Sequence, residues 1–164
     1  MEEVTKEYRH IPVLLSECLE QSNLKTHYTF VDATLGGAGH SSEVAQRLGS
    51  DGVLIGIDQD EMALAAAGAR LRNLALNTPP QIELLRGNFG NLDELLLEAE
   101  IPGVDAFLFD LGVSSPQLDF PSRGFSFKED SPLDMRMDPG KQTVTAAELI
   151  NTLDASELTR IIRD

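Results

Sequence analysis

The sequence has few cysteines, few basic residues and no long apolar run. Its 164 residues contain one cysteine, Cys18, which excludes an intramolecular disulfide and is typical of a protein in the reducing cytoplasm. No stretch approaches the ~18 apolar residues that a membrane-spanning helix needs. The first ten residues are charged and lack the apolar run of a secretion signal. These absences favour a cytoplasmic protein with no membrane partner.

Basic residues are scarce as well, since 13 Lys and Arg stand against 27 Asp and Glu and give a formal net charge of −14. A body of that charge repels phosphates, which argues against non-specific binding to nucleic acid. The sequence has no Cys/His cluster, so no metal site is expected. Hydrophobic residues make up 41% and charged residues 24%, which is typical of a folded globular chain with a sizeable core.

Short apolar runs of strand length alternate with helical segments in the first two thirds of the chain. The four runs cover residues 30–35, 53–58, 82–86 and 106–111. Their near-continuous hydrophobicity is typical of parallel strands that are covered on both faces. We expect three helices between them, over 41–48 (beginning on a serine cap), 60–74 and 92–100. This order predicts an α/β fold, with a Rossmann-like doubly wound parallel sheet.

The pattern changes after Leu111, because residues 112–142 contain four prolines, three glycines and no clear strand. Two short helices are expected beyond them, each behind a capping pattern that starts at Thr145 or at Asp154. We therefore predict two domains, over residues 1–113 and 114–164.

The sequence ends inside an amphipathic helical pattern and has no strand signal beyond the fourth. Four parallel strands leave an exposed sheet edge, so we expect an incomplete sheet in a fragment or a truncated gene product. Such an edge could also pair with a second copy and form a homodimer.

A glycine-rich loop follows the first apolar run, with Gly36, Gly37 and Gly39 ahead of a helix. Asp58 ends the second run, where a carboxylate can accept hydrogen bonds from both ribose hydroxyls of an adenosine. The combination indicates a nucleoside-binding site, for a dinucleotide or for S-adenosylmethionine. Ser42 stands where strict dinucleotide spacing needs glycine, and Asp32 precedes the glycines, which favours S-adenosylmethionine. The alternative for Asp32 is that it only caps a turn.

Two further residues follow predicted strands. Phe89 comes after the third run and could stack on an adenine, although a lone phenylalanine there is more often part of the core. Asp110 closes the fourth apolar run, and ligands bind beyond the carboxyl ends of such strands. Because an unpaired carboxylate is costly to bury, a functional role is favoured for Asp110.

Six sequence blocks carry a resemblance to a known family. They are HIPVLLSE (10–17), DATLGGAGHS (32–41), IDQD (57–60), DLGVSSPQLD (110–119), RGFSF (123–127) and PLDMRMD (132–138). In this order they resemble the RsmH (MraW) family of S-adenosylmethionine-dependent methyltransferases. The resemblance implies a class I methyltransferase fold, in which residues 114–164 begin a helical inserted substrate-recognition domain. It also implies methylation of the N4 amine of a cytosine in 16S ribosomal RNA of the small subunit.

The resemblance also implies a set of site residues. The implied cofactor-binding residues are Ala38, Gly39 and His40 at the amino-acid end, Asp58 at the ribose, Phe89 at the adenine, and Asp110 and Gln117 in the rest of the pocket. The candidate acceptors for the amine proton are Asp110 and the backbone carbonyls of residues 111–113. Many amino-methyltransferases have an Asp-Pro-Pro-aromatic turn where this chain has Asp-Leu-Gly-Val, so Asp110 is either a base or only a cofactor ligand.

Contacts with RNA would come from Arg123, Lys128, Arg136 and Lys141. The stronger alternative for the two arginines is internal pairing with nearby aspartates. Two other functions stay open at this point, a nicotinamide-dependent oxidoreductase and a non-catalytic remnant that binds cofactor weakly.

Overall fold

The computed structural model describes residues 12–163 and divides into two compact units, Met1–Asp110 and Leu111–Asp164. We describe each unit by itself. The boundary predicted from the sequence lies after Val113, and the interpretation of the second unit as the start of an inserted domain stays a prediction. None of the described helices is long and apolar enough to cross a membrane.

The first unit is an alternation of helices and strands, which confirms the predicted α/β class. Its elements are α1 (Leu15–Gln21), β1 (Thr29–Asp32), α2 (Gly39–Ala45), β2 (Val53–Asp58), α3 (Glu61–Arg72), β3 (Gln81–Arg86), the 3-10 turn η1 (Phe89–Asn91), α4 (Leu92–Glu98) and β4 (Ala106–Leu108). The strands form one parallel sheet in the order β3-β2-β1-β4. The chain therefore winds outward from β1 to β3 and then crosses back to β4, which is the doubly wound topology.

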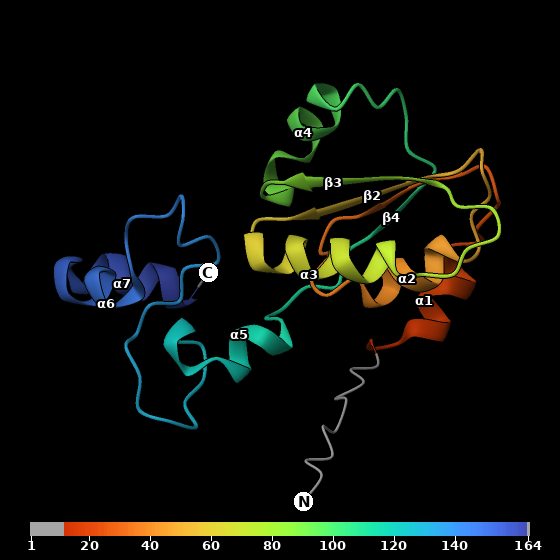
Figure 1. The fold of residues 1–164 in the computed structure, drawn as a ribbon. Helices are drawn as coiled ribbons and strands as arrows, with labels where there is room; N and C mark the ends of the chain where they lie inside the picture. Colours follow the sequence, from red (N-terminus) through yellow and green to blue (C-terminus); the bar gives the residue numbers. More distant parts are fainter. Residues whose placement is uncertain (1–11, 164) are drawn as a thin grey trace, which may run out of the picture. The chain divides into compact units, whose positions relative to one another are not determined.

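Helices cover both faces of this sheet, with α1, α2 and α3 on one face and α4 on the other (Figure 1). Side chains alternate along β1, so that Phe30 packs among residues of the first face and Val31 among those of the second. The neighbouring strand β2 repeats this alternation with Leu54 and Ile55, both fully buried. Burial of such side chains stabilises the fold by about 1.5–3 kcal/mol each. The two clusters of buried side chains, one on each face, stabilise the sheet, and loops form its carboxyl edge.

The second helix begins differently from the sequence prediction. It starts at Gly39 rather than at 41, behind Ala38, which has a left-handed φ of 57° and makes no side-chain cap. The expected serine cap was wrong, because Ser41 lies inside α2 and its hydroxyl donates to Asp32. The adjoining strands β1 and β4 are also shorter than expected, because they separate after Asp32 and Leu108.

The second unit contains short helices joined by a long loop. They are α5 (Ser115–Asp119), the 3-10 turn η2 (Pro121–Arg123), α6 (Ala146–Thr152) and α7 (Ala155–Arg163). The capping box predicted ahead of α6 is confirmed, since Glu148 N–H donates to Thr145 Oγ1 and Thr145 N–H donates to the Glu148 carboxylate. Asp154 accepts backbone N–H bonds from Ser156 and Glu157 at the start of α7, as the second capping pattern predicted. Helices α1 and α5 were not predicted.

Candidate functional site

Three aspartates lie at the carboxyl ends of neighbouring parallel strands. Asp32 ends β1 and Asp58 ends β2, while Asp110 follows β4 by two positions. Strand β1 pairs with both β2 and β4, so the three ends meet at one edge of the sheet. The chain reverses its winding direction when it crosses back from β3 to β4, so the point of reversal lies between β1 and β4. Ligands of doubly wound sheets bind at such a point.

The loop between β1 and α2 has the backbone shape that the glycines predicted. Gly36 has a φ of +49°, a conformation that favours glycine, and a side chain at Gly37 would meet no atom within 4 Å. A Cβ at Gly39 would collide with Cγ of Pro12, so this glycine allows the close approach of the segment before α1. The loop is therefore closely packed at Gly39 and has free space beside Gly37. The sequence block 10–17 lies partly outside the described residues.

Asp58 ties the end of β2 to the glycine loop. Its Oδ2 accepts the Gly36 N–H (2.9 Å) and its Oδ1 accepts the Asp60 N–H (2.9 Å). Burial raises the pKa of the Asp58 carboxyl, and the backbone hydrogen bonds from Asp60 and Gly36 act against that rise. Each carboxylate oxygen has more than one acceptor site, so capacity remains for the hydroxyls of a ligand.

Asp32 is only 2% exposed and is held by two donors. Ser41 Oγ donates to Oδ2 (2.7 Å) and the Thr34 N–H donates to Oδ1 (3.2 Å). Burial raises the pKa of Asp32, while the bonds from Ser41 and Thr34 oppose the rise. These contacts are those of a turn-capping residue, the alternative that the sequence analysis had left open. A role for Asp32 beside a ligand stays a prediction.

His40 and Asp110 face each other across the same edge. His40 is buried at the start of α2, with Nε2 3.1 Å from the carbonyl oxygen of Val13 and Nδ1 3.9 Å from Asp110 Oδ2. A carbonyl can only accept, so Nε2 donates to Val13, and Nδ1 is the ring nitrogen that faces Asp110. The Asp110 side chain is half exposed and accessible to a ligand. The structure therefore places His40, which follows Ala38 and Gly39 in the chain, beside Asp110, and the assignment of these residues to a cofactor site stays a prediction.

Thr34 belongs to this site and was missed by the sequence analysis. Its hydroxyl oxygen accepts the backbone N–H of Asp110 at 2.7 Å, across 76 residues of sequence. Ser41, which the sequence predicts to be a helix cap, is instead a hydrogen-bond partner of Asp32. The Thr34 contact had no local signal because it joins residues 76 positions apart, and the Ser41 contact depends on the shape of the glycine loop between Asp32 and Ser41.

Phe89 is not a core residue, which was the commoner alternative for it. It begins η1 after β3, is 41% exposed, and packs edge to face against Phe109 with 5.9 Å between ring centroids. Phe109 follows β4 at the opposite edge of the sheet and is itself 46% exposed. The alternation of residues 106–109 was the available signal for Phe109, since it places Phe107 and Phe109 on one face. Stacking of Phe89 on an adenine stays a prediction.

Gln117 lies in the second unit and is 4% exposed. Its Oε1 accepts the Ser114 N–H (2.9 Å) at the start of α5, and its Nε2 lies 3.0 Å from the sulfur of Met137. These contacts hold the loop of the second unit. The assignment of Gln117 to a cofactor pocket stays a prediction.

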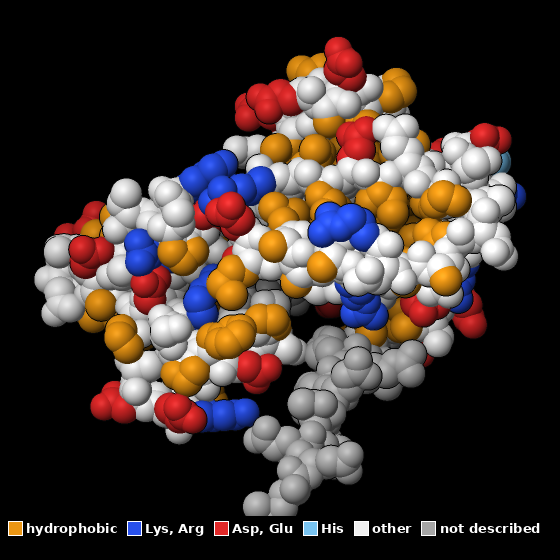
Figure 2. Space-filling view, in the orientation of Figure 1, with side chains coloured by type: hydrophobic (Ala, Val, Ile, Leu, Met, Phe, Trp, Pro, Cys, Tyr) orange, Lys and Arg blue, Asp and Glu red, His pale blue; other side chains and the backbone are white. Residues whose placement is uncertain are grey.

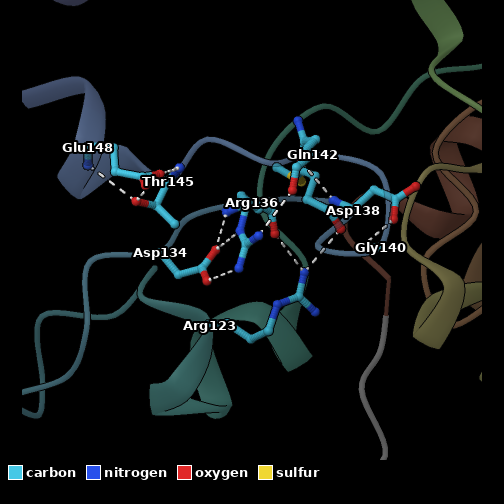
Figure 3. A network of polar contacts seen from close by, with 9 residues as sticks. Arg123, Asp134, Arg136, Asp138, Gly140, Gln142, Thr145 and Glu148 are labelled. Carbon is cyan, nitrogen blue, oxygen red and sulfur yellow. Dashed lines mark hydrogen bonds and ion pairs between the residues drawn. The ribbon is translucent and has the colours of Figure 1, made fainter. Parts of the chain in front are cut away.

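A polar network holds the long loop of the second unit (Figure 3). The Arg136 guanidinium donates to both oxygens of Asp134, at 2.8 and 2.7 Å, and also to the carbonyl of Gln142. Hydrogen bonding from Arg136 lowers the pKa of Asp134 to about 2. Arg123 donates to the carbonyls of Arg136 and Met137. Arg136 thus pairs with an aspartate, the alternative weighed against RNA contacts, whereas Arg123 donates to backbone carbonyls of the same loop.

The two candidate lysines differ from these arginines, because Lys128 and Lys141 are exposed. Among residues 12–163, no group of three or more His, Cys, Asp or Glu side chains is placed to hold a metal ion.

The fold and the strand-end carboxylates together define an α/β protein of the Rossmann-like methyltransferase class. The sequence model of the MraW methylase family matches residues 7–164. The chain therefore belongs to the MraW methylase family, and the predicted resemblance is confirmed.

Three relatives show how far the similarity extends. The chain is 49% identical over 158 residues to the ribosomal RNA small subunit methyltransferase H of Lachnospira eligens, covering 96% of this chain and 49% of that protein. It is 48% identical over 154 residues to the protein of that name from Mycoplasma mycoides subsp. mycoides, covering 94% and 48%. It is 46% identical over 159 residues to methyltransferase H 2 of Agathobacter rectalis, covering 96% and 49%. The chain spans about half the length of these curated relatives.

Proposed function

We propose that the protein acts in S-adenosylmethionine-dependent methylation of the N4 amine of a cytosine in 16S ribosomal RNA of the small subunit. The observation that carries the proposal is the meeting of the glycine loop, Asp58 and the His40–Asp110 pair at one edge of the sheet. Membership of the MraW methylase family and the names of the relatives support it.

The residues at this edge fit S-adenosylmethionine. The loop is open beside Gly37, Asp58 has acceptor capacity for ribose hydroxyls, and the ring of Phe89 is exposed toward solvent. His40, Ala38 and Gly39 would hold the amino-acid end. The cofactor supplies a methyl group on a sulfonium, which is already a good leaving group, so the protein mainly has to position the two partners.

Asp110 is our candidate for the group that meets the substrate amine. The lone pair of a cytosine amine is conjugated with the ring, so an acceptor beside it favours a pyramidal nitrogen and then takes up the proton. A half-exposed carboxylate at the end of β4 is accessible for that task. The cytosine must be unpaired or flipped out of a helix to reach it.

RNA binding must overcome the charge of the chain, −14. On the face that Figure 2 shows, basic and acidic side chains are interspersed rather than gathered into a large basic area. The exposed Lys128 and Lys141 are therefore the candidate phosphate contacts, which suits recognition of one RNA site rather than indiscriminate binding. Such an enzyme would act in the cytoplasm, where ribosomal subunits are found.

A homodimer is a further part of the proposal. In the part of the chain that the structure describes, β4 pairs only with β1, which leaves its outer edge for a strand of a second copy. Sedimentation at increasing protein concentration would show a dimer, and a monomer at all concentrations would rule this part out.

Two other functions compete with methyl transfer. An NAD-dependent oxidoreductase would use the same glycine loop and Asp58, but family membership weighs against it. A cofactor-binding remnant without catalysis is the alternative that follows from the chain spanning half of its relatives.

The direct test is transfer of a labelled methyl group to small ribosomal subunits, followed by digestion of the RNA and identification of the nucleoside. We expect N4-methylcytidine, formed by this chain or by a version extended to the length of its relatives, and a loss of about 100-fold in rate for Asp110→Asn. Activity only in the extended version would identify this chain as the remnant. A methyl group on another atom, or no transfer by either version, would overturn the proposal.

A further inference from the structure

Strands β1 and β4 separate at the place where the candidate site opens. The ladder between them runs in register to Asp32 and Leu108, and the Ala33 N–H still donates to Leu108 O (2.9 Å). Beyond that point the chain after β1 stays with β2, since the Leu35 N–H donates to Ile57 O (3.0 Å). The end of β4 therefore loses its backbone neighbour.

A side chain continues the ladder across this gap. In the same register, the Asp110 N–H would be the next donor from β4 to the chain after β1. It donates instead to Oγ1 of Thr34 at 2.7 Å. A hydroxyl oxygen takes the place of a backbone carbonyl, so the strands can part while Asp110 keeps a partner.

Thr34 is itself held in place. Its N–H donates to Asp32 Oδ1, and Asp32 is buried and bound on its other oxygen by Ser41. The hydroxyl that meets Asp110 therefore projects from a turn that is anchored in the core of the first unit. Asp110, by contrast, has a half-exposed side chain and lies just beyond the end of an edge strand.

We propose that Thr34 is a positioning residue, whose hydroxyl fixes the backbone of Asp110 and thereby sets the place of the Asp110 carboxylate beside His40 Nδ1. The inference rests on the proposed function, because it assigns Asp110 a role toward the methyl donor and the substrate amine. Thr34 acts only through Asp110 and touches no reacting atom.

The test compares three single variants by calorimetric titration with S-adenosylmethionine. Thr34→Val keeps the shape and removes the acceptor, so we expect the dissociation constant to rise about tenfold. Thr34→Ser keeps a hydroxyl and should stay within about twofold of the unmodified protein. Thr29→Val is the matched control, because Thr29 lies at the opposite end of the same strand β1, and it should also stay within about twofold.

A double-variant cycle separates positioning from a general structural role. If Thr34 acts through Asp110, adding Thr34→Val to Asp110→Asn changes the dissociation constant by less than about twofold. Independent, multiplicative effects of the two substitutions would overturn the inference, as would an unchanged affinity in Thr34→Val alone. A fall in the unfolding temperature without any change in affinity also counts against it.

Failure of the proposed function gives a different result from failure of the inference. If the unmodified protein binds no S-adenosylmethionine, the proposed function is wrong, and NMR of the free protein then decides the role of Thr34. The inference requires faster hydrogen exchange at the Asp110 amide in Thr34→Val. It also requires that the NMR chemical shifts of the His40 ring in Thr34→Val move toward those in Asp110→Asn. Unchanged exchange and ring shifts would overturn it.

Discussion

A buried carboxylate next to a hydroxyl is the main electrostatic feature of the site at the scale of single residues. Asp32 is 2% exposed, and its pKa is raised by burial and held back by the hydrogen bonds of Ser41 and Thr34. A raised pKa means that the folded protein binds this proton more tightly than the unfolded chain does. The ionised form therefore costs stability, and this cost sets in as the pH rises above the ordinary value of 3.8.

Ser41→Ala should destabilise the protein by about 1.5–3 kcal/mol at pH 7, because it removes a hydrogen bond to a buried charged group. The loss should shrink toward pH 4, because the raised pKa means that Asp32 takes up its proton above the ordinary value of 3.8. Urea unfolding at both pH values measures it. Ser42→Ala is the matched control, since Ser42 is equally buried but its hydroxyl donates to the carbonyl of Ala38. A Ser41→Ala cost that does not depend on pH would contradict the electrostatic account of Asp32.

Gly39→Ala should weaken the contact between the glycine loop and the segment before α1. The new Cβ would collide with Pro12. The segment would then move, and the Val13 carbonyl would move away from His40 Nε2. We expect the affinity for S-adenosylmethionine to fall about tenfold or more while the unfolding temperature changes little. Gly103→Ala is the control, because a Cβ there meets nothing within 4 Å. Unchanged affinity in Gly39→Ala would show that this contact does not support the site.

Most elements of the first unit were predictable from the sequence, because their signals are local. The strands at 53–58 and 81–86 coincide with the runs predicted at 53–58 and 82–86, and α3 follows Asp60, whose side chain accepts the Met62 N–H. Asp58 and Asp110 were noticeable for the same reason, since each closes an apolar run, and their roles toward a ligand stay predictions. The ends of β1 and β4 were not predictable, because they depend on where two distant segments separate. Helix α2 was placed two residues late because its start depends on a left-handed Ala38 rather than on a serine.

Helices α1 and α5 were missed for another reason. Both are short, with seven and five residues. Helix α1 begins behind Leu14 in a left-handed conformation and has no side-chain cap. Isolated helices of this length are marginal, although α5 has a local signal in the capping box of Ser114 and Gln117.

The Asp134–Arg136 pair gives a prediction for the loop of the second unit. The pKa of Asp134 is lowered to about 2, so the pair adds stability at pH values above the ordinary 3.8 and loses it as the pH falls toward 2. Carboxyl NMR should give a titration midpoint for Asp134 at about pH 2. Arg136→Gln should return it toward 3.8, whereas Lys128→Gln, at an exposed lysine of the same loop, should leave it unchanged. A midpoint near 3.8 in the unmodified protein would contradict the pairing.

At the scale of the whole molecule, the charge of −14 describes a chain that spans about half the length of its relatives. The composition argues against indiscriminate phosphate binding, but it is compatible with an enzyme that recognises one RNA site. Large apolar side chains are also exposed in the second unit, among them Phe127, which is 99% exposed, and Ile162, which is 84% exposed. Figure 2 shows such apolar side chains on the surface of both units.

Replacing Lys128 and Lys141 together by glutamine should weaken RNA binding without changing the affinity for S-adenosylmethionine. Each lost phosphate contact lowers the slope of log K against log salt by about 0.7 for single-stranded RNA, so the pair should lower it by about 1.4. Filter binding at several salt concentrations gives the slope. An unchanged slope would remove these lysines from the RNA contacts.

Binding of S-adenosylmethionine at the carboxyl edge of the sheet, through Asp58, can be measured by calorimetric titration. The unmodified protein and Asp58→Asn are each titrated with S-adenosylmethionine and with NAD. We predict that the unmodified protein binds S-adenosylmethionine more tightly than NAD and that Asp58→Asn weakens this binding about tenfold or more. Tighter binding of NAD, or equal affinity of both proteins for S-adenosylmethionine, would contradict the account.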